Sequence, residues 1–300
     1  MTSATHHATK EQSHEWITAE DIAPDEVNTS PKKRPNAFTE LMSSAKKPKP
    51  KPTAEDVQPT STFEKAKNVV KGWDPRNGLG TYIEKPETNP EGRVVEYDDD
   101  FVVIRDKYPK ASVHLLLIPR LGQYHTQHPL HLLSTDPAFL ATVRTRIARL
   151  KSLAAAELRR LYGPLSASDT PYQSALEDLM SSPSPPSSSQ VAALPSGRDW
   201  EANIIAGVHT HPSMNHLHIH ALSREMHSEC VKHKKHYLSF TTSFLVRMEE
   251  FPLEQGSERF SPGDWPSWDM KCWRCGENYK NKFARLKGHL EEEFDVWKRE

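Results

Sequence analysis

The sequence predicts an α+β domain followed by a small second module, and three observations support this. Three histidines alternate with leucine and isoleucine over residues 216–220, as in a strand with one polar face. Residues 137–162 carry apolar side chains at helical spacing. Near the C-terminus, a Cys-x2-Cys pair is followed after 13 residues by a histidine, which is close to the spacing of zinc modules.

Composition narrows the class of protein but does not identify a partner. The chain has 300 residues, 36% hydrophobic content and a formal net charge of -1. Its three cysteines fit no disulfide framework, and no apolar run is long enough for a membrane span or a signal peptide. A reducing, intracellular setting is therefore predicted, with no membrane partner.

Residues 1–60 are rich in Pro, Ser, Thr, Lys and Glu and show little apolar periodicity. Such a segment cannot bury enough apolar surface to offset the entropy lost on ordering, so we expect a disordered basic tail. Two basic clusters at 32–34 and 46–51 have the spacing of a bipartite nuclear localisation signal, which predicts a nuclear protein. The alternative is an ordinary solvated linker.

Ordered structure is expected to begin with a short helix over 63–70, which Gly72 and Pro75 end. Strand signals follow at 94–97, 101–105 and 113–118. The long helix predicted over 137–162 has an apolar stripe made by Leu140, Val143, Ile147, Leu150, Leu158 and Leu161.

The second half of the domain begins with a serine- and proline-rich stretch at 163–198, which is interpreted as a low-complexity insertion. Residues 203–208 predict a buried strand beside the histidine strand. Residues 237–248 are expected to form a further strand and then the start of a helix.

The alternating histidines indicate a site. In a strand, the rings of His216, His218 and His220 share one surface, while Leu217 and Ile219 face a core. The alternative that requires no function is a solvated histidine-rich edge. Neutral imidazole is also a common ligand for zinc or copper, so the residue pattern alone leaves a metal site open.

Residues 216–222 match every position of His-φ-His-φ-His-φ-φ, where φ is apolar, the signature of the histidine-triad (HIT) nucleotide hydrolases and transferases. The strings at 207–216, 105–111 and 232–236 resemble the aprataxin branch of that superfamily. The resemblance extends from about residue 63 to the C-terminus. It implies a HIT catalytic domain with an antiparallel sheet and helices over 61–255, and a zinc finger over 256–300.

By this resemblance, His218 is the nucleophile that takes AMP from an adenylate as a covalent AMP-histidine. Neutral imidazole is available as a nucleophile near pH 7, and the phosphoramidate it forms is labile to water. His220 is then expected to donate to a phosphate oxygen and His216 to orient its neighbours. His209 resembles the family histidine on the leaving-group side.

Further side chains are implied to bind the nucleotide. Ser213 would supply a hydroxyl and Lys232 a positive charge to the phosphate. Lys110 matches a lysine near the phosphates, and Asp106 matches an acidic position that binds ribose hydroxyls; ordinary turn residues are the alternative for both. Neither a Walker-type loop nor a paired-carboxylate box accompanies the site, so no catalytic metal is expected.

The C-terminal module is predicted to hold one structural zinc ion. Cys272, Cys275 and His289 have the C-x2-C-x13-H spacing. Glu293 lies four residues after His289 and so shares its helix face, which favours it as the fourth ligand, with Glu292 as the alternative. The resemblance to fungal family members also favours glutamate in this position.

The start of this module is basic, since Glu277 is the single acidic residue between positions 271 and 290. Such a face binds nucleic-acid phosphates independently of sequence; a solvated helix face is the alternative. The residues predicted to contact DNA are Lys271, Arg274, Lys280, Lys282, Arg285 and Lys287. The family resemblance further implies that the helix over 63–70 lies against a terminal base pair.

Together these inferences predict a nuclear, monomeric hydrolase that acts on DNA 5′-adenylates left by abortive ligation. Its partner would be double-stranded DNA with an adenylated 5′ end at a nick or break, and AMP would be the product. Two alternatives stay open: a HIT hydrolase of nucleoside phosphoramidates or dinucleoside polyphosphates, and a non-enzymatic zinc-finger adaptor that binds nucleic acid.

Overall fold

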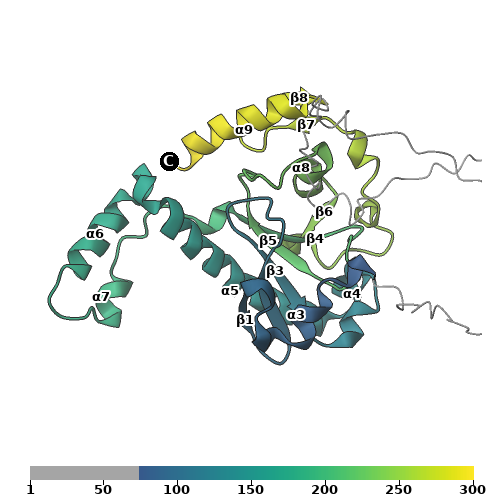
Figure 1. Cartoon of the computed structure of the whole chain (residues 1–300), viewed down its shortest axis with the longest axis horizontal. Helices are drawn as coiled ribbons and strands as arrows, with labels where there is room; N and C mark the ends of the chain where they lie inside the picture. Colours follow the sequence, from purple (N-terminus) through teal and green to yellow (C-terminus); the bar gives the residue numbers. More distant parts are fainter. Residues whose placement is uncertain (1–73) are drawn as a thin grey trace, which may run out of the picture. The chain divides into compact units, whose positions relative to one another are not determined.

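The computed structural model describes residues 74–300 (Figure 1). The basic tail, the two basic clusters and the helix expected over 63–70 lie outside the described residues. Within the described range, no helix has the length and apolar character needed to cross a bilayer.

An antiparallel sheet lies at the centre of the described residues, with strand order β1-β2-β3-β5-β4-β6. Its strands are β1 (Val94–Tyr97), β2 (Phe101–Arg105), β3 (His114–Pro119), β4 (Ile204–His209), β5 (Ile219–Ser223) and β6 (Leu245–Arg247). The α+β class is confirmed, and the first two strands begin and end where the sequence predicts. The central pairing of β3 with β5 sets Leu117 opposite Ile219 and Leu116 opposite His220.

The helix α5 (Pro137–Tyr162) has the predicted bounds, because both ends carry helix signals. Asp136 caps the N-terminus by accepting a hydrogen bond of 2.9 Å from the Phe139 backbone N–H. Pro137 suits the first helical position, because the backbone N–H that proline lacks would have no partner within the helix there. Gly163 caps the C-terminal end. Figure 1 shows α5 lying against the sheet, where it packs across β3, β4 and β5.

The two faces of the sheet bury different residues. Leu217 and Ile219 point into the core shared with α5, as the alternation predicts. The opposite face carries the histidines. Two hydrophobic clusters flank them. One is formed with the helix α3 (Gly80–Glu84), and the other with α8 (Lys234–Thr241) and the C-terminal module.

The order of elements over residues 237–248 is the reverse of the expected one, since α8 comes first and β6 follows. Tyr237 and Phe240 are β-favouring in isolation, but as parts of one helical turn with Leu238 they bury together against Trp265 and the finger. Tertiary burial thus overrides the local strand preference, and β6 then pairs with β4.

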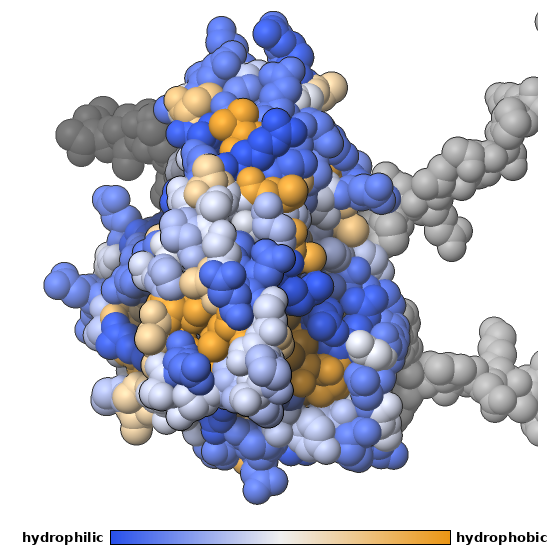
Figure 2. All heavy atoms as spheres, turned by 90° about the vertical axis from the view of Figure 1, so that its left-hand side faces the viewer, coloured by the Kyte–Doolittle hydropathy of each residue, from blue (hydrophilic) through white to orange (hydrophobic). Residues whose placement is uncertain are grey.

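The insertion over 163–198 contains two helices, α6 (Thr170–Met180) and α7 (Ser188–Ala192). A capping box between Ser187 and Gln190 starts α7 within the serine-rich stretch. Figure 1 shows both helices beyond the end of α5. That side faces the viewer in Figure 2, where separate hydrophobic patches interrupt a mostly hydrophilic surface.

The C-terminal module consists of a hairpin, β7 (Met270–Lys271) with β8 (Asn278–Lys280), and the helix α9 (Phe283–Trp297). Trp297 packs edge-on against Trp200, with ring centroids 6.0 Å apart. The insertion contacts the residues that follow α9, because the Ala167 N–H donates to the Arg299 carbonyl at 2.9 Å and the Ser168 N–H to the Glu300 carbonyl at 2.7 Å. The finger is thereby attached to the catalytic domain.

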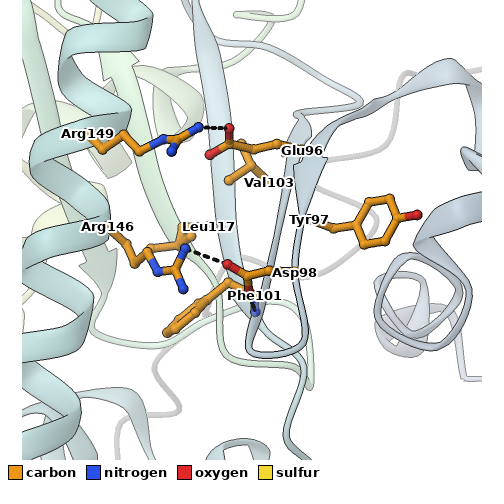
Figure 3. Close-up of a pocket in the computed structure, with 8 residues that line it drawn as sticks. All are labelled: Glu96, Tyr97, Asp98, Phe101, Val103, Leu117, Arg146 and Arg149. Carbon is orange, nitrogen blue, oxygen red and sulfur yellow. Dashed lines mark hydrogen bonds and ion pairs between the residues drawn. The ribbon is translucent and has the colours of Figure 1, made fainter.

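A hollow of about 150 Å³ lies between the β1–β2 hairpin and α5 (Figure 3). Two ion pairs cross it, Arg146 with Asp98 and Arg149 with Glu96. Both guanidinium groups are therefore already neutralised by carboxylates. We interpret these ion pairs as contacts that hold the β1–β2 hairpin against α5, and the hollow as the space between the two elements.

Candidate active site and zinc centre

The histidine row begins before the strand that was predicted to hold it. Ladder pairing with β3 starts at Ile219, so among the three histidines His220 lies inside β5, while His216 and His218 lie on the segment that enters it. This corrects the prediction that all three occupy one strand. The rings of His218 and His220 still lie together, with centroids 4.9 Å apart.

The hydrogen bond of His218 determines its tautomer. Its Nδ1 lies 2.8 Å from the backbone carbonyl oxygen of His216. A carbonyl can only accept, so Nδ1 must carry the proton and Nε2 must carry the lone pair. Burial lowers the pKa of His218, which favours the neutral ring. The result is a neutral imidazole with Nε2 available as a nucleophile.

A chain of hydrogen bonds gives His220 the complementary tautomer. The backbone N–H of Lys110 donates to His114 Nδ1 at 3.1 Å, so the proton of neutral His114 is on Nε2. That Nε2–H donates to His220 Nδ1 at 2.9 Å, which puts the proton of His220 on its own Nε2. Among the described residues, this buried Nε2 has no hydrogen-bond partner. His220 therefore presents a donor beside the nucleophile.

His114 is a site residue that the sequence analysis missed. It lies in an apolar run, and its signal was a single histidine at a position where a central strand should be hydrophobic. Burial, more than the repulsion from nearby Lys110, lowers the pKa of His114 to about 4. The ring is thus neutral near pH 7. Because its Nδ1 accepts from the Lys110 N–H, its Nε2 must donate to His220, and this determines the tautomer of His220.

Hydrogen bonding accounts for how close these groups lie to one another. Asp106, His114 and His220 bring ligand atoms within 4.8 Å of one another. His114 Nε2 and His220 Nδ1 are 2.9 Å apart, which is the distance of the hydrogen bond that joins them. The hydrogen bond between them accounts for the geometry.

The structure places the other predicted histidines in different surroundings. His209, the last residue of β4, is buried with its ring 4.5 Å from that of His220 and 4.8 Å from those of Phe240 and Phe244. Its role toward the leaving group stays a prediction. His216 lies apart from this group, with its ring 5.1 Å from that of His125.

The predicted nucleotide-binding residues surround the histidines from three segments. Asp106 accepts a hydrogen bond of 2.7 Å from the Tyr108 N–H, and its second oxygen lies 3.5 Å from His114 Nε2. Lys110 is buried, and its ammonium donates to the Tyr108 carbonyl at 2.6 Å. Its main contact with the histidine chain is thus through its backbone N–H.

Ser213 and Lys232 lie on the two loops that flank the site. Ser213 is buried, and its carbonyl accepts a hydrogen bond of 3.2 Å from Arg76 Nε, a contact that the sequence analysis did not foresee. Lys232 is partly exposed, and its backbone N–H donates to His236 Nδ1 at 3.1 Å. Their contacts with phosphate stay predictions.

The structure brings together the four predicted zinc ligands. Donor atoms of Cys272, Cys275, His289 and Glu293 all lie within 4.8 Å of one another. Cys275 Sγ is 3.2 Å and Glu293 Oε1 is 3.4 Å from His289 Nε2, close to the roughly 3.3–3.8 Å that separates ligands around a tetrahedral zinc ion. Glu292 is exposed and lies outside this cluster.

The structure pairs Arg274 with two carboxylates of its own module, since its guanidinium lies against Glu293 and Glu300. Its contact with DNA phosphate stays a prediction. Glu300 in turn pairs with Arg198 of the insertion at 3.3 Å. Arg274 is therefore positioned to orient a metal ligand. All six predicted DNA contacts are exposed: Lys271, Arg274, Lys280, Lys282, Arg285 and Lys287.

Two family models match the chain. A HIT domain model matches residues 87–227, and a C2HE / C2H2 / C2HC zinc-binding finger matches residues 241–296. The aprataxin-like protein of Schizosaccharomyces pombe is 31% identical over 262 residues, which cover 87% of this chain and 94% of that protein. This chain belongs to the aprataxin family.

Two further aprataxin-family matches have similar identity over about three quarters of this chain. The aprataxin-like protein of Saccharomyces cerevisiae is 30% identical over 227 residues, which cover 73% of this chain and 96% of that protein. A crystal structure of the aprataxin ortholog Hnt3 in complex with DNA aligns with a TM-score of 0.58 and 30% identity, and the alignment covers 75% of this chain and 96% of that one. The predicted family and fold are confirmed.

The buried, hydrogen-bonded histidines predict that this aprataxin-family protein loses stability in mild acid. Unfolded histidine has a pKa near 6.5, whereas the pKa of folded His114 is about 4. Between about pH 6.5 and 4 the unfolded state therefore binds more protons, so the free energy of unfolding falls as the pH is lowered, by roughly 2–3 kcal/mol from this residue. Urea unfolding at pH 7, 6 and 5 measures this slope.

The matched variant is His114→Gln, which has no titrating group at this position. Its free energy of unfolding should be lower at pH 7 but should depend less on pH than that of the wild type. An equal pH slope in the two proteins would show that His114 is not the source.

Proposed function

We propose that this protein removes AMP from adenylated 5′ ends of DNA and restores a 5′-phosphate. One observation carries the proposal: in an aprataxin-family HIT domain, the hydrogen bond to the His216 carbonyl leaves Nε2 of His218 free to attack phosphorus. The enzyme is a hydrolase of the HIT superfamily.

In the first step, the lone pair of His218 Nε2 forms a bond to the phosphorus of the AMP group. The bond from that phosphorus to the oxygen bridging it to the DNA phosphate breaks, and its electron pair leaves on the DNA 5′-phosphate. The ring keeps its Nδ1 proton and becomes positively charged. The His216 carbonyl, which accepts from Nδ1 at 2.8 Å, faces that charge.

In the second step, a water oxygen attacks the same phosphorus from the side opposite His218. The nitrogen–phosphorus bond breaks, its electron pair returns to Nε2, AMP leaves, and one water proton goes to solvent. In both steps charge develops on phosphate oxygens, and the Nε2–H of His220 is a pre-oriented donor for them. Dividing the reaction in two lowers each barrier.

In this proposal, the zinc finger binds the DNA. Solved relatives include Hnt3 in complex with DNA and with DNA and guanosine. On this chain, exposed cations extend from β7 to the first turns of α9: Lys271, Lys280, Lys282, Arg285 and Lys287. Their phosphate contacts would make binding salt-dependent. One zinc ion, held by the four clustered ligands, would cross-link the hairpin to α9.

The cellular setting is part of the same proposal. The basic clusters at 32–34 and 46–51 support import into the nucleus, where adenylated DNA ends arise.

The decisive experiment uses a nicked duplex whose 5′ end carries labelled AMP. Incubation with the protein should release AMP and leave a 5′-phosphate, and rapid denaturation should trap labelled AMP on His218. A nucleoside phosphoramidate serves as the competing substrate. Faster turnover of that small molecule, with no salt-sensitive preference for the duplex, would favour the general HIT hydrolase instead.

A further inference from the structure

His125 contacts the catalytic segment although it lies more than 90 positions away in sequence. It ends the short 3-10 helix Gly122–His125, between β3 and the helix α4 (Pro129–Thr135). Its Nδ1 accepts a hydrogen bond of 3.0 Å from the backbone N–H of Leu217. Its ring also meets that of His216 edge to face, with centroids 5.1 Å apart. No role was predicted for His125 from the sequence.

Both polar groups of one peptide unit are thereby engaged. The unit joins His216 to Leu217. Its carbonyl oxygen accepts from His218 Nδ1 at 2.8 Å, and its N–H donates to His125 Nδ1 at 3.0 Å. The direction of each hydrogen bond is determined, since a backbone N–H only donates and a carbonyl only accepts. The hydrogen bonds therefore run in one sense from His218 through the peptide to His125.

We propose that His125 is a positioning residue for the nucleophile, which acts on His218 through the 216–217 peptide. Hydrogen bonds linked through an amide polarise one another, so an acceptor on the N–H makes the carbonyl oxygen a stronger acceptor. The stronger carbonyl holds the ring of His218 in one orientation and keeps the proton on Nδ1. This inference rests on the proposed function.

The effect should be larger in the transition state than in the ground state. As Nε2 bonds to phosphorus, the ring gains positive charge and the Nδ1–H becomes a stronger donor. The polarised carbonyl then stabilises the charged ring more than the neutral one, which speeds the chemical step without tightening substrate binding.

His125 is suited to this role because it stays neutral. Its ring is partly buried, and burial, followed by the nearby His216, lowers its pKa to about 4. A neutral ring keeps the Nδ1 lone pair that accepts from Leu217, whereas a protonated ring has no acceptor.

The test compares two substitutions of His125 in the full chain. His125→Leu removes the acceptor, and His125→Asn keeps one, because the Asn Oδ1 can take the place of Nδ1. His131→Leu is the control, since this exposed histidine of α4 contacts Phe260 and lies outside the site. Rapid-quench measurement of AMP-histidine formation gives the rate of the first step, and substrate titration gives KM.

We expect His125→Leu to slow adduct formation about tenfold with KM nearly unchanged, since one hydrogen bond of moderate strength is lost. His125→Asn should recover most of the rate, and His131→Leu should match the wild type. Equal defects in the Leu and Asn variants, or a change in KM alone, would overturn the inference and leave His125 a structural residue.

A second readout needs no substrate and separates this inference from the proposed function. In ¹⁵N NMR, the Nδ1–H of His218 should show a weaker hydrogen bond in His125→Leu than in the wild type, with Asn between them. An unchanged signal would overturn the inference. A wild-type protein that forms no AMP adduct would instead overturn the proposed function.

Discussion

His218→Ala is expected to lose turnover of 5′-adenylated DNA by on the order of 10⁴-fold to 10⁶-fold. The variant has no nitrogen to take AMP, so the two-step route is closed, and the remaining donors can only polarise the phosphate for direct attack by water. Because His218 is almost fully buried beside His220, the substitution also leaves a small cavity but removes no backbone contact of β5.

Two measurements are needed for this variant. Release of AMP under single-turnover conditions gives the rate, and denaturing gels of labelled protein give the adduct. Binding to the adenylated duplex should be nearly unchanged, and His131→Ala is the matched control because it removes an exposed histidine. An adduct of normal yield on His218→Ala would show that another residue is the nucleophile.

Cys272→Ser is expected to unfold the finger and to release its zinc ion. Cys272 is buried in the core that the module shares with α8, and its Sγ is one of the four clustered donor atoms that would hold the ion. Zinc-finger peptides derive roughly 10–16 kcal/mol from metal binding, more than the small apolar core of such a module supplies. Bound zinc per chain, together with limited proteolysis of α9, measures the loss.

Two further variants serve as a control and as an intermediate case for zinc binding. Cys230→Ser is the matched control, since Cys230 is a free cysteine outside the ligand cluster, and should keep its zinc. Arg274→Ala should keep the fold but weaken zinc binding about 10–100-fold, because the orienting partner of Glu293 is lost. Zinc retained at one ion per chain in Cys272→Ser would mean that the ligand set is wrong.

The elements that could be predicted are those whose signals are local. The bounds of α5 depend on Asp136, Pro137 and Gly163, which act within one turn of the helix ends. The apolar residues between the histidines share a face because side chains alternate along extended backbone. The zinc ligands could be paired because two spacings, C-x2-C and i,i+4, bring side chains together without long-range contacts.

The tautomers of the site could not be predicted, because each depends on a partner from another segment. His114 comes from β3, His125 from the loop after it, and the Lys110 backbone from the turn before it. Arg274 belongs to a cationic run in the sequence, yet Glu293 and Glu300 decide that it faces the zinc site. The reversal of helix and strand over 237–248 has the same origin, since burial against Trp265 outweighs local preference.

The amino-acid sequence alone therefore predicted a histidine nucleophile and a set of zinc ligands, and it identified the family to which this protein belongs. Only the tertiary structure decided which nitrogen of each ring carries the proton and which carboxylates pair with Arg274. The physical reason is that residue type and spacing act over one or two turns of backbone. Protonation and pairing are instead determined by donors, acceptors and charges that lie close in space but far apart in sequence.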